Sequence, residues 1–342
     1  MTTSLDKVLP IGFGLMNFTT IPDKKFTQEE FNDTFKDILD GVEVSDQQPM
    51  FINSGEFYGF PERHDGLKRL GGFFKSYPKY ADSVIVSIKA GLNACYAPDT
   101  SVNNLDTAVK VINEYMQPLY DARKLLPKTL DIFTVARIGE EPIEEIMQYL
   151  ELHIAQNHFT GICLSEVAPS TLERACSSGK VSAIEIEFSL FHPDAIDNGL
   201  FKIAAENNIV IVGYSPLGKG ALVGMSASEL TDGDFRKSLD KFNNSEAVDH
   251  NAALVEYVKK AADKNNLTPA QLALSWVLSF SGNAGNPRVL PLPGGTNVQR
   301  QLSNFQSKKL PVKVLAEIHE FLKSFKTAGY RYNEVMDQAL SK

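Results

Sequence analysis

The sequence predicts an α/β fold in which eight parallel strands close into a barrel, with helices between the strands. Apolar runs typical of buried strands alternate with amphipathic stretches typical of helices, and this alternation occurs eight times along the chain. The length of 342 residues suits one (β/α)8 barrel with insertions. Two alternatives stay open, namely an open doubly wound sheet and the two-domain organisation that length alone suggests.

Eight segments have the composition expected of the strands, and all but the first two are rich in Val, Ile, Leu or Phe. In chain order they cover residues 10–16, 50–53, 84–89, 130–136, 161–165, 183–188, 209–214 and 289–293. Capping signals mark helix starts between them. Thr27 and Glu30 have the spacing of a capping box, Ser170 and Glu173 repeat it, and Thr268 precedes a proline at the first expected helical position.

A long interval, 215–288, separates the last two expected strands. Its part 224–250 is polar and lacks helical periodicity. We therefore expect a single barrel domain over 1–342, with a large loop around 215–250 after the seventh strand that could serve as a lid.

Composition and charge exclude several functional classes. The 34 basic and 42 acidic residues give a net charge of −8, which argues against a dedicated nucleic-acid-binding protein. The three cysteines show no Cys-x-x-Cys spacing and the six histidines do not cluster, so neither a disulfide scaffold nor a metal site is expected. No secretory signal or membrane-spanning run is recognisable, and we expect a cytoplasmic protein without membrane partners.

Polar residues stand at the carboxyl ends of the expected strands, which is where (β/α)8 barrels build their active sites. They are Asn53, Lys89, Arg137, Ser165, Glu166, Glu185, Glu187, Tyr214 and Ser215. Each alone could merely begin a solvated loop. As a set they would converge on one mouth of the barrel, and this favours a site there.

Lys89 is the most informative of these residues. It shares one face of its strand with Ile85 and Ser87, so it points to the same side as they do. A buried ammonium favours the ionised form of a neighbouring phenol and lowers the pKa of that phenol. Tyr58, five residues after Asn53, is a candidate partner and proton donor to a carbonyl oxygen, although taken alone its position favours an ordinary loop aromatic.

Two glycine-rich motifs do not fit the nucleotide-binding patterns they resemble. In the first, Asn17 stands where a dinucleotide fingerprint has its third glycine, and no helix starts directly after it. In the second, 213–219 matches the spacing of a P-loop, but Gly220 replaces the Ser or Thr that would bind Mg²⁺. The second turn could still hold a pyrophosphate with backbone amides, and Arg300, one turn into a later helix, could bind a phosphate or simply be exposed.

Together these motifs resemble the aldo-keto reductase family over nearly the whole chain. In family order they read Gly-Phe-Gly-Leu-Met, Glu-Phe-Tyr-Gly, a strand ending in Lys89, Leu-Asp-Ile-Phe-Thr-Val-Ala-Arg, Leu-Ser-Glu-Val, Gly-Tyr-Ser-Pro-Leu-Gly and Pro-Leu-Pro-Gly-Gly. The resemblance implies a (β/α)8 (TIM) barrel and NADPH as the cofactor. It also implies that Tyr58 is the general acid and Lys89 the residue that lowers the pKa of its phenol.

Two positions depart from the family pattern at the catalytic centre. Asn53 stands where most members have an aspartate, so Lys89 is expected to lack the carboxylate that would pair with it. Ala136 stands where most have a histidine. Arg137 could replace this histidine, although alternation on an ideal strand would point it the other way.

The resemblance also implies a set of cofactor contacts. Tyr214 matches the aromatic residue that stacks on nicotinamide, and Ser165 matches a carboxamide contact, while Glu166 and Glu185 replace the usual amide contacts. The pyrophosphate loop corresponds to Ser215, Leu217 and Gly218; the segment near the 2′-phosphate to Gly294, Gly295 and Thr296; and the adenosine contacts to Arg300 and Asn304.

The departures themselves are similar to those of fungal pyridoxal reductases, a subgroup of the family. This resemblance implies reduction of a small aldehyde, pyridoxal, to pyridoxine with NADPH. A reductase of broader specificity and a non-catalytic NADP-binding module of the same fold are the alternatives.

Overall fold

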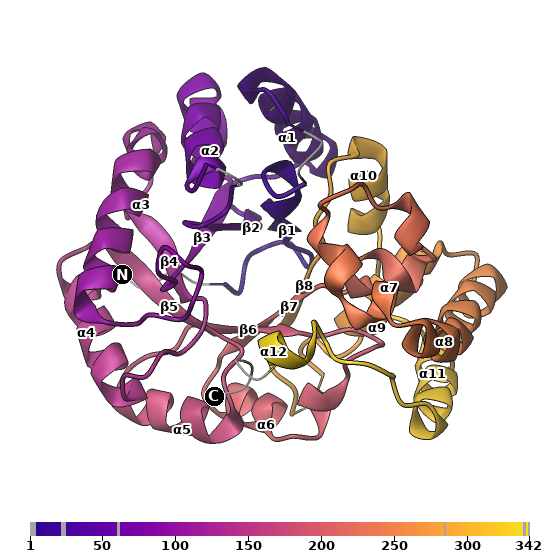
Figure 1. Ribbon diagram of the computed structural model, residues 1–342. Coiled ribbons are helices and arrows are strands. Elements are labelled where there is room, and N and C mark those ends of the chain that lie inside the picture. The colour runs from indigo at the N-terminus through magenta and orange to yellow at the C-terminus, as the bar shows by residue number, and fades with distance from the viewer. Residues whose placement is uncertain (1–4, 22–24, 60–61, 284, 338–339, 341–342) are drawn as a thin grey trace.

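The computed structural model describes residues 5–21, 25–59, 62–283, 285–337 and 340 of the chain. Eight parallel strands follow one another around the sheet in chain order (Figure 1). They are β1 (Phe13–Gly14), β2 (Met50–Gly55), β3 (Val84–Ala90), β4 (Leu130–Val135), β5 (Phe159–Ser165), β6 (Ala183–Glu187), β7 (Val210–Tyr214) and β8 (Val289–Leu292).

The sheet closes between its first and last strands. Gly12 N donates to Pro291 O at 3.0 Å, and Gly14 N donates to Pro293 O at 2.9 Å. These bonds join the segment around β1 to β8, so the sheet has no free edge there. The predicted (β/α)8 barrel is confirmed, and the two-residue β1 is shorter than the expected first strand.

Helices surround the barrel (Figure 1). They are α1 (Gln28–Val42), α2 (Asp65–Ser76), α3 (Val102–Ala122), α4 (Ile143–Ala155), α5 (Pro169–Ser178), α6 (Leu200–Glu206), α7 (Asp240–Asn243), α8 (Ser245–Lys264), α9 (Pro269–Leu278), α10 (Val298–Phe305), α11 (Val312–Ser324) and α12 (Glu334–Asp337). The capping boxes of Thr27 and Thr268 are present. Ser170 does not cap α5, because the helix already begins at Pro169.

The apolar core has two layers. A small cluster inside the barrel includes Phe51, Ile132, Cys163, Val212 and Leu290, and a much larger one fills the space between the strands and the helices. Both faces of each strand are therefore buried, as expected for parallel strands in this fold. Toward the carboxyl ends of the strands, the inward-facing residues change from apolar to polar.

The connection after β7 runs from Ser215 to Asn244. It contains three 3-10 segments, η4 (Gly218–Val223), η5 (Ala227–Glu229) and η6 (Phe235–Ser238), and the short helix α7. Helix α8 begins at Ser245, where the Asn244 side chain accepts a hydrogen bond from Ala247 N. The last six residues of the expected loop, 245–250, are therefore helical, because Asn244 supplies a cap that we did not recognise.

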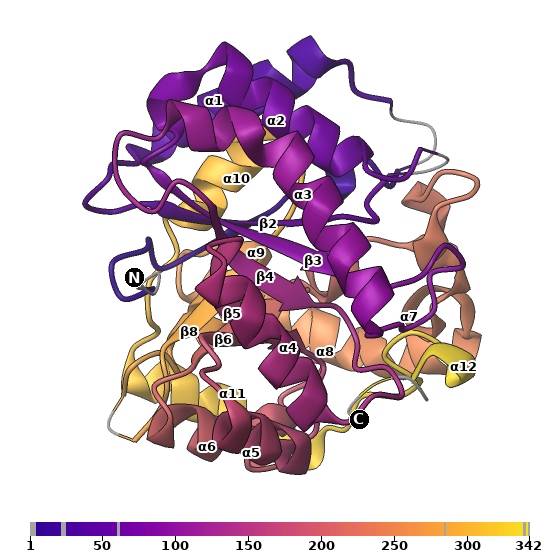
Figure 2. The ribbon, with the colours of Figure 1, turned by 90° about the vertical axis from the view of Figure 1, so that its left-hand side faces the viewer.

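After α11 the chain returns to the barrel mouth. We call residues 325–337 the C-terminal strap. Thr327 Oγ1 donates to Phe191 O at 2.6 Å, and Asn251 makes two hydrogen bonds with the backbone of Ala328. In the side view the strap's helix α12 lies at the same end of the barrel as α7 (Figure 2). Among the described residues, no helix is long and apolar enough to cross a membrane.

Candidate active site

A buried ion pair spans the barrel mouth. Lys89 Nζ, from β3, lies 2.5 Å from Glu185 Oε1, from β6. Asn53, from β2, donates from Nδ2 to the other oxygen of Glu185 at 2.9 Å. The Lys89 and Glu185 side chains are only 10% and 2% exposed. Burial disfavours the ammonium, but the charge and hydrogen bond of Glu185 act together with the neighbouring Tyr58 phenol to outweigh it, so the pKa of Lys89 lies above its usual range.

This pair corrects one expectation from the sequence. Lys89 does not lack a carboxylate, because Glu185 supplies one from the opposite side of the barrel. Both residues were expected at the carboxyl ends of their strands, but a pattern within one strand cannot tell which strands lie close enough for their side chains to meet. Glu185 is therefore held by Lys89 and Asn53, rather than presenting two unengaged oxygens to a cofactor carboxamide.

Tyr58 lies in the loop between β2 and α2, and its side chain is buried, with 8% of the residue exposed. Its ring folds back over Gly55, where a Cβ atom would lie 2.7 Å from the ring, so glycine is needed at the end of β2. Burial raises the pKa of the phenol, and Lys89 lowers it by less. The net direction is upward, contrary to the lowered pKa that the sequence led us to expect, because burial outweighs the charge of Lys89 and Glu185 adds to the rise.

Arg137 reaches the mouth although strand alternation would have pointed it away. Strand β4 ends at Val135, so the alternation no longer applies two residues later. Arg137 Nη1 donates to Ala136 O at 2.6 Å and to Ser165 Oγ at 3.3 Å. Its positive charge makes a small downward contribution to the pKa of Tyr58.

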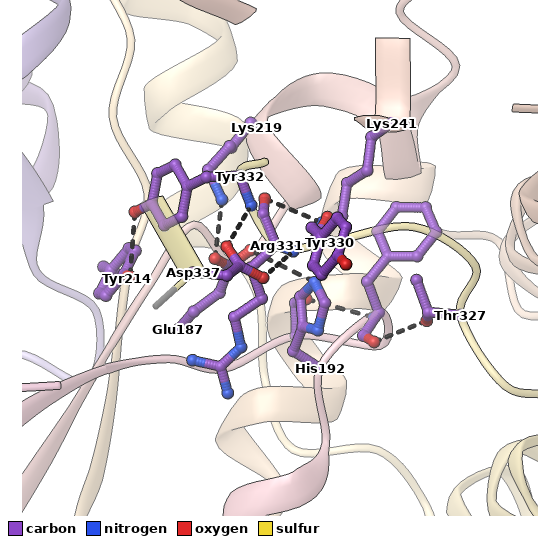
Figure 3. A network of polar contacts seen from close by, with 12 residues as sticks. Glu187, His192, Tyr214, Lys219, Lys241, Thr327, Tyr330, Arg331, Tyr332 and Asp337 are labelled. Carbon is purple, nitrogen blue, oxygen red and sulfur yellow. Dashed lines mark hydrogen bonds and ion pairs between the residues drawn. The ribbon is translucent and has the colours of Figure 1, made fainter. Parts of the chain in front are cut away.

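The strap brings an aromatic residue to the end of β7. The hydroxyls of Tyr332 and Tyr214 are 3.0 Å apart, and Lys219 Nζ lies 4.3 Å from the centre of the Tyr332 ring (Figure 3). Lys219 also pairs with Glu187 Oε2 at 2.7 Å. Tyr332 therefore lies between the residue expected to stack on nicotinamide and a buried lysine.

A second strap residue binds an expected cofactor contact directly. Arg331 Nη1 lies 2.8 Å from Glu166 Oε2, and the other oxygen of Glu166 accepts from Glu187 N at 2.8 Å. Asp337 accepts from the backbone amides of Arg331 and Tyr332 and fixes this part of the strap (Figure 3). Glu166 is thus already paired with a cation.

Beside this network lies a cavity of about 280 Å³ between the strap and the segment after β6. His192 lines the cavity and lies 3.8 Å from Glu187 Oε1. Burial, followed by the charges of Lys241, Arg331 and Lys219, lowers the pKa of His192 well below its usual value. The imidazole is therefore neutral near pH 7.

The remaining expected cofactor contacts follow β7 and β8. Ser215, Leu217 and Gly218 form the turn after β7, and a Cβ at Gly218 would lie 2.6 Å from the ring of Phe191. Gly294, Gly295 and Thr296 form the turn after β8, and a Cβ at Gly294 would lie 2.9 Å from Gly14 O. Neither glycine could be replaced without displacing a neighbouring atom of the protein, so the close packing of both turns requires glycine.

The start of α10 presents the two expected adenosine contacts differently. Arg300 is exposed, and its backbone amide is bound by Asn297, the cap of the helix. Asn304 is buried and lies one turn further on. In the described ranges no group of three or more His, Cys, Asp or Glu side chains could hold a metal ion.

The sequence reasoning missed three residues of the mouth. Lys219 was considered only as part of a rejected P-loop pattern, and Arg331 and Tyr332 were not considered at all. A signal was present in the strap, since the basic and aromatic run Tyr330-Arg331-Tyr332 follows the amphipathic helix α11. Its target could not be found from the sequence, because Arg331 and Glu166 are 165 residues apart.

Comparison with known proteins gives the family. The model of the aldo/keto reductase family matches residues 10–323. The chain is 30% identical to "Probable pyridoxal reductase 2" of Schizosaccharomyces pombe, with 98% of both chains covered. It is 33% identical to a Saccharomyces cerevisiae protein whose name also contains the words pyridoxal reductase, with 95% of this chain and 96% of the other covered. It is 30% identical to an S. pombe aldo-keto reductase, yakc, whose name carries NADP(+), with coverage of 96% and 92%. The chain belongs to the aldo/keto reductase family.

Proposed function

We propose that this protein reduces the aldehyde of pyridoxal to the alcohol of pyridoxine with NADPH, and that Tyr58 donates the proton. The observation that carries the proposal is the burial of Tyr58 and Lys89 at the mouth: Tyr58 is 8% exposed, and the Lys89 ammonium lies 5.1 Å from the centre of the Tyr214 ring. The two relatives named as pyridoxal reductases, similar over nearly their full length, support the choice of substrate.

The residues present fit a dinucleotide. The turn at Gly218 offers backbone amides to a pyrophosphate, and the turn at Gly294 lies in the segment that would face the 2′-phosphate; neither turn leaves room for a side chain at its glycine. Tyr214 and Ser165 would orient the nicotinamide, Ser215 and Leu217 would complete the pyrophosphate turn, and Gly295, Thr296, Arg300 and Asn304 would hold the adenosine end. When bound, NADPH supplies the hydride.

The protein's own part is to hold a proton and to polarise the carbonyl. Because its pKa is raised, Tyr58 carries its proton at neutral pH, so it can donate to the carbonyl oxygen as that oxygen gains charge. Lys89 and Arg137 place positive charge around the phenol and stabilise the same developing charge. Arg137 thereby occupies the role left open by Ala136.

A reductase of broader specificity is the second candidate, and the resemblance to yakc favours it. The two are separated by following the absorbance of NADPH with pyridoxal and with several unrelated aldehydes. A strong preference for pyridoxal supports the proposal, and equal rates support the broader enzyme. Tight NADPH binding without turnover of any aldehyde would contradict both and indicate a binding module.

The role of Tyr58 is tested by Tyr58→Phe, which removes one hydroxyl. We expect kcat to fall by roughly 10²–10⁴-fold with NADPH binding retained, which is the usual contribution of a positioned acid. Tyr96→Phe is the matched control, since Tyr96 is 46% exposed in a neighbouring loop. Equal kcat for the wild type and Tyr58→Phe would remove Tyr58 as the proton donor.

A further inference from the structure

The C-terminal strap supplies a positive charge to the end of β5. Arg331 Nη1 lies 2.8 Å from Glu166 Oε2, and the two side chains are 21% and 2% exposed. The other oxygen of Glu166 accepts a hydrogen bond from Glu187 N at 2.8 Å, so both oxygens of the carboxylate are engaged. The strap lies beyond residue 323, where the match to the family model ends, so the family pattern does not supply this ion pair.

The strap is held at the mouth by further contacts. Tyr332, the next residue, has its hydroxyl 3.0 Å from the hydroxyl of Tyr214 at the end of β7 (Figure 3). Asp337 accepts from the backbone amides of Arg331 and Tyr332 at 2.8 and 2.9 Å. Arg331 is therefore fixed beside the strand ends at which the proposed function places the nicotinamide.

We propose that Arg331 makes the mouth bind reduced nicotinamide in preference to oxidised nicotinamide, by neutralising Glu166. The inference rests on the proposed binding of NADPH beside Ser165 and Tyr214. The nicotinamide ring is neutral in NADPH and carries a positive charge in NADP⁺. An uncompensated carboxylate at the end of β5 would attract the oxidised ring, and the guanidinium of Arg331 cancels this attraction.

Each of three buried carboxylates at these strand ends is paired with its own cation. The pairs are Glu166 with Arg331 at 2.8 Å, Glu185 with Lys89 at 2.5 Å and Glu187 with Lys219 at 2.7 Å. Arg137, whose Nη1 lies 3.3 Å from Ser165 Oγ, adds a further positive charge. Loss of Arg331 would leave Glu166 without its cation at a buried position, where solvent screens charges weakly.

Preference for the reduced ring suits the reduction of an aldehyde. In each turnover of the proposed reaction, NADPH must bind and NADP⁺ must leave. Release of product limits the rate of many enzymes, so weaker binding of NADP⁺ would speed its release and reduce product inhibition.

The experiment measures the ratio Kd(NADP⁺)/Kd(NADPH) by equilibrium binding, which requires no turnover. In Arg331→Met, Glu166 keeps its charge without a cation, so the ratio should fall on the order of tenfold. In Glu166→Gln, Arg331 keeps its charge without a carboxylate, so the ratio should rise by a similar factor. In the double variant both charges are removed, and the ratio should return to within about twofold of the wild type.

Two controls separate the charge of the mouth from general damage to the protein. The first is 2′-phospho-ADP-ribose, a fragment of the cofactor without the nicotinamide ring, which should bind the wild type and all three variants equally. The second is Arg236→Met, which removes the cation of an ion pair with similar burial. Arg236 lies 2.6 Å from Asp234, and the two side chains are 19% and 4% exposed. This variant should leave the ratio unchanged.

Two results would overturn the inference. One is a ratio that stays at the wild-type value, or moves in the same direction, in both single variants. The other is an equal loss of affinity for NADPH, NADP⁺ and 2′-phospho-ADP-ribose in Arg331→Met, which would give Arg331 a purely structural role. If Arg331→Met does not fold, the rise in Glu166→Gln and its cancellation in the double variant still decide.

Failure of the inference and failure of the proposed function give different results. The expected ratios in a protein that reduces no aldehyde would uphold the inference and contradict only the proposed function. Turnover of pyridoxal with a ratio that does not respond to either charge would contradict only the inference. A wild type that binds neither form of the cofactor would overturn both.

Discussion

A buried ion pair also lies at the opposite end of the barrel from the site. Arg123, which follows α3, contacts Asp131 at the start of β4, and the two side chains are 5% and 4% exposed. Asp131 also accepts from Val86 N, a backbone amide of β3, at 2.8 Å. Arg123 Nη1 donates to Thr129 O at 2.7 Å. Asp131 therefore balances a buried charge and satisfies a buried amide.

Asp131→Asn keeps the volume of the side chain but leaves Arg123 buried without a counter-charge. Breaking a buried pair in this way costs about 3–5 kcal/mol, and we expect the free energy of unfolding to fall by that amount. The amide oxygen can still accept from Val86 N, so the loss reflects mainly the uncompensated guanidinium. The pair is remote from Tyr58, so KM should not change.

The assay is urea unfolding followed by the fluorescence of Trp276, the single tryptophan, which is fully buried. Glu144→Gln is the control, because Glu144 binds Arg174 by two bonds of 2.7 and 2.6 Å, with side chains 38% and 54% exposed. It should barely move the midpoint. If Asp131→Asn shifts the urea midpoint no more than this control, burial does not increase the contribution of the pair to stability, and the reasoning is refuted.

Two further predictions concern the cofactor and the strap. Arg300→Ala should weaken NADPH binding roughly 10–100-fold and NADH binding far less, since charge-assisted bonds to the 2′-phosphate are lost. Titration of the protein with each cofactor checks this, with Gln299→Ala, a change at an exposed neighbour, as the control. Equal losses of affinity for NADPH and NADH would show that other residues bind the 2′-phosphate. Lys241 lies buried beneath the strap, where burial lowers its pKa from 10.5 to about 8. Between these values the unfolded chain binds more protons than the folded protein, so the stability of the wild type relative to Lys241→Met should rise with pH over that window. Urea midpoints at several pH values measure it, and a flat difference would contradict the pKa.

The barrel could be predicted because the local sequence of each strand indicates that the segment is a strand. Apolar runs such as 130–136 and 209–214 are buried on both faces, and their composition alone shows it. The prediction of the first strand was the least accurate: only Phe13–Gly14 form a strand, and a 3-10 helix already begins at Met16. Periodicity is a property of one segment, so it predicts correctly those elements whose structure depends on that segment alone.

Partners within the mouth could not be predicted in the same way. Lys89 and Glu185 were both expected at the carboxyl ends of their strands, but their meeting depends on the width of the barrel and on rotamers. The strap shows no regular spacing of apolar residues, so its sequence does not indicate that Arg331 reaches Glu166. The direction of the Tyr58 pKa was wrong for the same reason, since it depends on burial and on Glu185 as well as on Lys89.

The contact between Arg331 and Glu166 also bears on the order in which the protein folds. The two residues are 165 positions apart, so this contact requires closure of a loop that contains the second half of the barrel. Most barrel contacts, by contrast, join strands that are neighbours in the chain. Contacts between distant residues form late, since their entropy cost is recovered only after local structure exists. We therefore expect the strands of the barrel to pair before the strap docks at the barrel mouth during folding.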